Sequence, residues 1–183
     1  MKTIQTIILS ILSMTLFSAC IPSGDGAITV PFKANFYTDR NYDNTGEGVC
    51  TEDPYLGFNY QVGKGKATLL GSMDVTISFC GIEGTPFYKN GIGTFVAANG
   101  DKLYIKIPAE GEIGEVYPKE NHELYELQFQ DKFSFNGGTG RFAGATGEGY
   151  TDSFVDLLDD DGNFLPEHRT DHVWRGILKL PNK

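Results

Sequence analysis

Residues 73–79 read Met-Asp-Val-Thr-Ile-Ser-Phe, and apolar and polar side chains alternate along this segment without interruption. Successive side chains of a β-strand point to opposite faces, so this segment predicts a strand with one buried face and one wet face. An amphipathic helix would instead repeat its apolar residues every three or four positions. A strand that is wet on one side is typical of antiparallel sheets.

The same alternation recurs on both sides of this segment. The apolar sets are Val30, Phe32, Ala34 and Phe36; Leu103, Ile105 and Ile107; Tyr125, Leu127 and Phe129; and Trp174, Gly176, Leu178 and Leu180. About eight such runs with short connections predict an all-β domain, either an antiparallel barrel or a sandwich.

Turn residues separate the runs. Asn99-Gly100 predicts a type I′ hairpin between strands at 92–98 and 103–107, because both central residues of that turn need positive φ. Further boundaries are expected at Asn90-Gly91, Gly137-Gly138 and Asp161-Gly162. Segments 83–91 and 109–121 are expected to form the longer surface loops.

Residues 137–149 read Gly-Gly-Thr-Gly-Arg-Phe-Ala-Gly-Ala-Thr-Gly-Glu-Gly. This stretch resembles the Gly-Thr-Gly-Arg-Phe-x-Gly-Ala-Thr-Gly signature of bacterial secreted β-barrels that are grouped with allene oxide cyclase and dirigent proteins. Segments 63–71 and 98–104 resemble other parts of that group, with Leu69 where a histidine is usual. The resemblance implies a single antiparallel eight-stranded barrel of the calycin type, often a trimer in the plant relatives. It transfers no catalytic residue to this chain.

Two residues of this glycine-rich stretch are candidates for ligand binding. If alternation runs unbroken from Phe142, Glu148 and Tyr150 point into the barrel, where burial would raise the pKa of the Glu148 carboxyl. A bulge at the glycines would turn both side chains outward, because a slip of one residue reverses every side chain.

The first nineteen residues have the pattern of a signal peptide. Lys2 supplies the positive charge, and the apolar run at 7–17 is too short for a membrane span, which needs roughly 20 residues. Phe17-Ser18-Ala19-Cys20 resembles the lipobox of bacterial lipoproteins, which implies acylation of Cys20. Ordinary cleavage and release is the alternative.

The predicted organisation is a lipoprotein signal peptide at 1–19, a lipidated tether at 20–27 and the barrel at 28–183. Membrane attachment would then run through the lipid on Cys20. Ile21 beside that cysteine resembles lipoproteins that are sent to the outer membrane, so we expect an exported, envelope-anchored protein.

The charge of the chain excludes some partners. The formal net charge is −9, and it becomes more negative by one when the signal peptide with Lys2 is removed. Such an acidic protein is not expected to bind nucleic acid, which requires clustered Lys and Arg. Cys50 and Cys80 remain as an even pair, and we expect them to form a disulfide in an oxidising compartment. Two buried thiols are the alternative.

No motif for catalysis, a metal or a cofactor emerges from the sequence. His168 and His172 would lie about 13 Å apart in a strand, too far to share one ion. Asp159-Asp160-Asp161-Gly162 lacks the glutamate of a calcium loop and predicts a hairpin turn. We therefore expect no catalytic residues, metal site or cofactor.

Three functions fit these observations. The leading hypothesis is a lipid-anchored barrel that binds a small, partly apolar ligand in its interior. The alternative is a structural or protein-interaction module of the cell envelope, with a packed interior and exposed aromatic residues on loops such as 85–88 or 115–118. An isomerase or cyclase rests on fold analogy alone. A continuous internal cavity would favour the first hypothesis.

Overall fold

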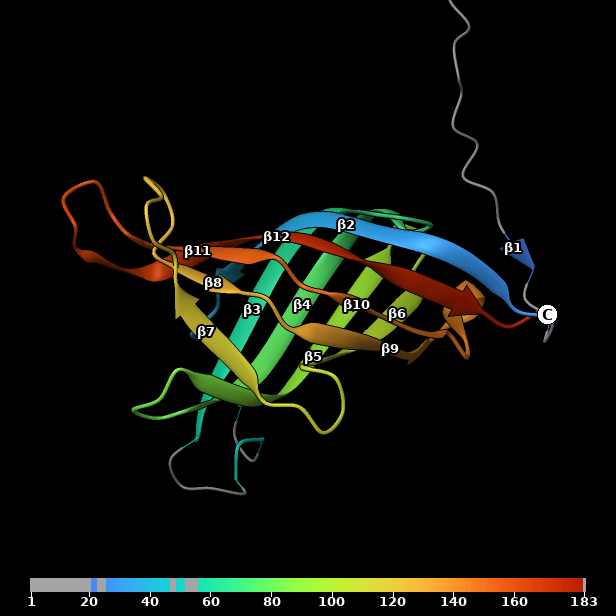
Figure 1. Cartoon of the computed structure of the whole chain (residues 1–183), viewed down its shortest axis with the longest axis horizontal. Helices are drawn as coiled ribbons and strands as arrows, with labels where there is room; N and C mark the ends of the chain where they lie inside the picture. The colour runs from blue at the N-terminus through green and yellow to red at the C-terminus, as the bar shows by residue number, and fades with distance from the viewer. Residues whose placement is uncertain (1–20, 23–25, 47–48, 52–55, 183) are drawn as a thin grey trace, which may run out of the picture.

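The computed structural model describes residues 21–22, 26–46, 49–51 and 56–182 of the chain, which form a closed β-barrel (Figure 1). The expected signal peptide and Cys20 lie outside these residues. The elements are β1 (Ile21–Pro22), β2 (Ile28–Arg40), β3 (Leu56–Ala67), β4 (Gly71–Ile82), β5 (Phe87–Ala97), β6 (Lys102–Ile107), β7 (Gly114–Pro118), β8 (Leu127–Phe129), β9 (Lys132–Gly138), the 3-10 helix η1 (Gly140–Phe142), β10 (Thr146–Tyr150), β11 (Ser153–Leu158) and β12 (Phe164–Leu180). Among the described residues, no helix is long and apolar enough to cross a membrane.

The strands occupy eight positions around the barrel, and each position pairs antiparallel with the next. β6 and β7 both pair with β5, and they share one position because the chain is interrupted between them. The pairs β8–β9 and β10–β11 are likewise successive parts of broken strands. β12 then pairs with β2 from Arg169↔Asp39 to Leu180↔Ile28 and closes the ring. The predicted eight-stranded antiparallel barrel is confirmed.

Two glycines of β3 allow the barrel to coil tightly. A Cβ on Gly63 would lie 1.8 Å from the carbonyl oxygen of Tyr37, and one on Gly65 would lie 2.2 Å from the Cβ of Phe36. Side chains at these positions would push β3 away from β2. The close approach of the two strands therefore depends on the missing side chains.

The interior is filled by apolar side chains at the alternating positions that the sequence indicated. An aromatic cluster lies at its centre and contains Phe32, Phe36, Phe95, Phe133, Phe135 and Trp174. The ring centroids of Phe36 and Trp174 lie 5.0 Å apart at 78°, and those of Phe133 and Trp174 lie 5.3 Å apart at 29°. Phe142 of η1 is fully buried and packs into the same core.

Several predicted boundaries are wrong in detail. The hairpin at Asn99-Gly100 exists, but only Gly100 has positive φ, so the turn is not type I′. Asn90 and Gly91 lie inside β5, next to a register shift, and do not form a turn. The expected loops 83–91 and 109–121 are shorter, because β5 begins at Phe87 and β7 occupies 114–118.

The predicted disulfide between Cys50 and Cys80 is confirmed. It ties the connection between β2 and β3 to β4. Cys80 is completely buried, so the bridge anchors an otherwise exposed segment to the core.

The two ends of the barrel differ. The start of β2 and the end of β12 lie at one end, on the right in Figure 1. The connections 83–86, 119–126 and 159–163 lie at the opposite end, on the left in Figure 1. We call this opposite end the loop end.

Candidate functional site

A chain of buried polar side chains links β12, β11, β2 and β3 inside the barrel; we call it the buried relay. Trp174 Nε1 donates to Ser153 Oγ at 2.9 Å, and Ser153 Oγ lies 2.8 Å from Nδ1 of His172. Nε2 of His172 lies 2.9 Å from Thr38 Oγ1, which donates to Gln61 Oε1 at 2.6 Å. Every member of the relay is at most 5% exposed.

The relay fixes the protonation of His172. Thr38 gives its hydroxyl hydrogen to Gln61, so it must accept a hydrogen from Nε2 of His172. Burial lowers the pKa of His172 to about 3, so its ring is neutral at pH 7. A neutral ring with its hydrogen on Nε2 accepts a hydrogen bond from Ser153 at Nδ1. The ring stacks on Phe36 with centroids 4.3 Å apart.

This pKa limits what the relay can do chemically. A general base works best when its pKa lies near the operating pH. His172 with a pKa of about 3 is too weak a base to take a proton from Ser153 at neutral pH. Ser153 and His172 lie within hydrogen-bond reach, but both are buried and the histidine is a weak base, so the pair is better suited to joining the strands than to activating the serine.

A small cavity adjoins the buried relay. Its volume is about 30 Å³. Its lining residues are Gln61, Ile77, Phe79, Tyr88, Gly91, Ile107, Phe129, Thr151, Ser153, Thr170, His172 and Trp174. Pockets for organic ligands usually measure about 300–1,000 Å³. The interior thus has room for one or two water molecules and is otherwise packed.

A second set of hydrogen-bonded polar residues, centred on Asp131, lies at the break between β8 and β9. The hydroxyl of Tyr88 donates to Oδ2 of Asp131 at 2.6 Å, and the backbone N–H of Glu115 donates to Oδ1 at 3.2 Å. Burial raises the pKa of the Asp131 carboxyl, although these two hydrogen bonds oppose the effect. Burial also raises the pKa of Tyr88 far above its ordinary value, and Asp131 adds to this. The contacts hold β7 and β5 beside the strand break.

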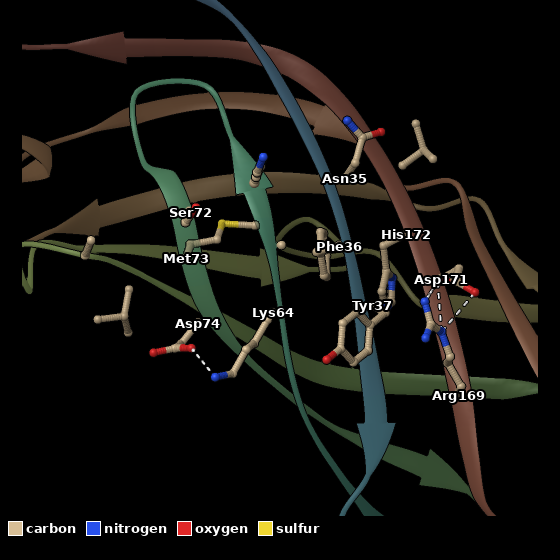
Figure 2. A pocket seen from close by; sticks show the side chains of 15 residues that line it. Asn35, Phe36, Tyr37, Lys64, Ser72, Met73, Asp74, Arg169, Asp171 and His172 are labelled. Atoms are coloured by element: carbon tan, nitrogen blue, oxygen red, sulfur yellow. Dashed lines mark hydrogen bonds and ion pairs between the residues drawn. The ribbon is translucent and has the colours of Figure 1, made fainter.

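A surface groove of about 740 Å³ lies on the outside of the barrel. It crosses β12, β2, β3, β4 and β5, as Figure 2 shows. Lys64 and Asp74 pair across it at 3.7 Å, and the guanidinium of Arg169 lies 4.3 Å from the ring centroid of Tyr37. Arg169 also pairs with Asp171 at 2.7 Å. Basic and acidic side chains both line the groove, so its charge favours neither a simple anion nor a simple cation.

The inward orientation that we expected for Glu148 and Tyr150 is not found. Both side chains are exposed, and that of Tyr150 is 58% exposed. Alternation does not run unbroken from Phe142, because η1 and the turn after it intervene. Gly149 faces inward instead, where a Cβ would lie 2.5 Å from the ring of Phe133. The outward orientation that the alternative gave is found, but its cause is the turn after η1 and not a bulge, because the register of β10 with β9 and β12 is continuous. An interior ligand role for Glu148 and Tyr150 therefore has no geometric support.

The glycine-rich stretch 137–149 is hydrogen-bonded to segments 63–71 and 98–104. Arg141 Nε donates to Oδ2 of Asp101 at 2.9 Å, and Arg141 Nη1 donates to the carbonyl oxygen of Leu69 at 3.0 Å. The backbone N–H of Lys102 donates to Thr139 Oγ1 at 2.9 Å. The three segments with the family resemblance thus meet at one end of the barrel. Leu69 contributes its carbonyl, so this contact does not depend on its side chain.

The remaining sequence candidates lie as the strand and turn interpretations predicted. His168 and His172 both belong to β12. Asp159 Oδ1 accepts the backbone N–H groups of Asp161 and Asn163 and shapes the hairpin between β11 and β12. Within the part of the chain that the structure describes, no three His, Cys, Asp or Glu side chains are grouped for a metal ion.

Sequence reasoning did not identify the buried relay. Its signal was a polar residue at a position where the strand alternation demands an apolar one. Thr38 continues the inward set of Phe32 and Phe36, and His172 continues that of Trp174. Ser153 could not be recognised in this way, because β11 is too short for its own alternation to show which face is inward. Its inward orientation becomes clear only from its pairing with His172 of β12.

Comparison of the chain with protein-family models, with curated proteins and with solved structures found no match. The likeness to barrels of the allene oxide cyclase and dirigent group therefore stays a prediction. The trimer that it implies is a prediction as well.

Proposed function

We propose that this protein is a cell-envelope interaction module: a packed barrel that contacts a partner protein through its loop end. The observation that carries the proposal is the size of the interior cavity, about 30 Å³. This is at least roughly tenfold below the volume that an organic ligand needs. The leading sequence hypothesis of an interior ligand is thus less well supported than its alternative.

The loop end has the side chains of a contact surface. Phe87 is 40% exposed and Tyr117 is 39% exposed. Both lie in segments that the alternative hypothesis expected to be loops, and the structure places them in β5 and β7, next to the connections of the loop end. Leu124 and Phe164 are also exposed at this end. Aromatic side chains are enriched in protein interfaces.

The charge of the loop end indicates the chemistry of the partner. The connections 83–86, 119–126 and 159–163 contain one lysine, Lys119, and no arginine. Their acidic residues are Glu83, Glu120, Glu123, Glu126, Asp159, Asp160 and Asp161. A protein surface that carries Lys and Arg around an apolar patch would complement this end.

Lipid attachment at Cys20 would orient this surface. Ile21, the residue after Cys20, pairs with Thr29 near the start of β2, at the end of the barrel opposite the loops. An anchor at Cys20 would hold that end near the membrane and turn the loop end away from it. The disulfide is compatible with an oxidising compartment outside the cytoplasm.

Photo-crosslinking of the full-length protein in its own cells tests the proposal. A benzophenone amino acid in place of Tyr117 should give one discrete protein adduct, which weakens when ionic strength is raised. The matched control replaces Tyr150, which is more exposed than Tyr117 but lies on the barrel wall. Equal labelling from both positions, or no adduct from Tyr117, would contradict contact through the loop end.

A further inference from the structure

The hydroxyl of Thr170 stands out among the buried polar groups. Thr170 lies on β12 next to His172, is 1% exposed and lines the interior cavity. Its Oγ1 has no hydrogen-bond partner among the residues that the structure describes. A buried hydroxyl without a partner costs about 1–3 kcal/mol, so such groups are normally satisfied.

The cavity determines what could satisfy this hydroxyl. No charged side chain lines it, so an ion would be desolvated without compensation. A volume of about 30 Å³ exceeds the roughly 10–15 Å³ that one water molecule requires. Most of the lining surface is apolar, but the hydroxyl-bearing residues Thr151, Ser153 and Thr170 are part of the lining. These polar groups distinguish the cavity from a wholly apolar one, which would remain dry.

Further polar groups of the lining are placed to share such a molecule. Thr151 Oγ1 accepts the backbone N–H of Asp131 at 2.8 Å, and its own hydroxyl hydrogen can be donated into the cavity. Gln61 ends the buried relay and also lines the cavity. A bound water typically makes about three hydrogen bonds, which these groups and Thr170 can supply.

We infer that the cavity is a binding site for one or two water molecules, with Thr170 Oγ1 as the main anchor. Bound water links the Thr170 hydroxyl to the polar groups beside the buried relay. The aromatic rings of Phe79, Tyr88 and Phe129 also line the cavity and pack together, with centroids 4.9–6.1 Å apart.

Nuclear Overhauser effects between water and side-chain methyl groups test this site, because methyl protons do not exchange with solvent. Ile77 and Ile107 line the cavity, and their methyl groups should show water cross-peaks in the wild-type protein. Thr170→Val keeps the shape of the side chain but removes the hydroxyl, and it should abolish these cross-peaks. Thr94→Val, which changes a threonine away from the cavity, should leave them intact.

Three further outcomes decide the inference. Absence of water cross-peaks at both isoleucines in the wild-type protein would overturn it, as would unchanged cross-peaks in Thr170→Val. If Thr170→Val fails to fold, Thr170→Ser provides the test, because it keeps the hydroxyl and should keep the cross-peaks. Titration with formamide, which has three heavy atoms, should not displace the water; displacement would show a site for a larger solute and refute the assignment.

Discussion

The burial of His172 should make the stability of the barrel depend on pH. The pKa of His172 is about 3 in the folded protein, against an ordinary value of 6.5 in the unfolded chain. As pH falls below about 6.5, the unfolded chain binds a proton that the folded chain does not. Stability from this group is therefore complete above pH 6.5 and is lost as pH falls toward 3. The total loss is roughly 5 kcal/mol.

Urea unfolding of the wild-type protein and of His172→Gln at pH 7.5 and pH 5 measures this effect. Glutamine can still bond to Ser153 and Thr38 but does not titrate in this range. Between these two pH values, the wild-type protein should lose about 2 kcal/mol more than the variant. Asp131 and His168, whose pKa values are also shifted, act equally in both proteins and cancel. Equal losses in the two proteins would refute the argument. So would an NMR titration in which the imidazole of His172 itself protonates near pH 6.5.

Two further predictions concern stability at neutral pH. Replacing Cys50 and Cys80 by serine should lower the free energy of unfolding by about 3–4 kcal/mol, because the bridge closes a segment with a sequence separation of 30; urea curves that match the wild type would contradict this. Gly140→Ala should lower stability more than Gly137→Ala in calorimetry. Both glycines have positive φ, but only at Gly140 would the new Cβ lie 1.7 Å from Oδ1 of Asp101, whereas Gly137 faces open space. Equal losses would show that backbone strain alone is responsible.

The alternation of side chains was sufficient to predict the sheet and its inward face. Val75 and Ile77 are buried as expected, and so are Phe32 and Trp174. The pattern works because burial on one side of a strand has a period of two, whatever the partner strands are. The number of runs and their short connections left a barrel and a sandwich both open, and the choice of a barrel rested on the resemblance of residues 137–149 to a barrel family.

The candidate site could not be predicted in the same way. The relay of Ser153, His172 and Thr38 joins residues up to 134 positions apart, and their contact depends on the register between strands. The predicted inward orientation of Glu148 was wrong for a local reason. Nothing in the period of the sequence showed that η1 would shift the alternation by one residue before β10.

The seam between β2 and β12 determines when the ring can close. It joins the first long strand to the last one over the whole range from Ile28 to Asp39. β12 also supplies His172 and Trp174 to the centre of the core. A nascent chain that ends before residue 164 therefore has an open sheet with the edge of β2 unpaired, a known template for aggregation. For a chain threaded through an export channel with its N-terminus first, closure must wait until the final strand has emerged.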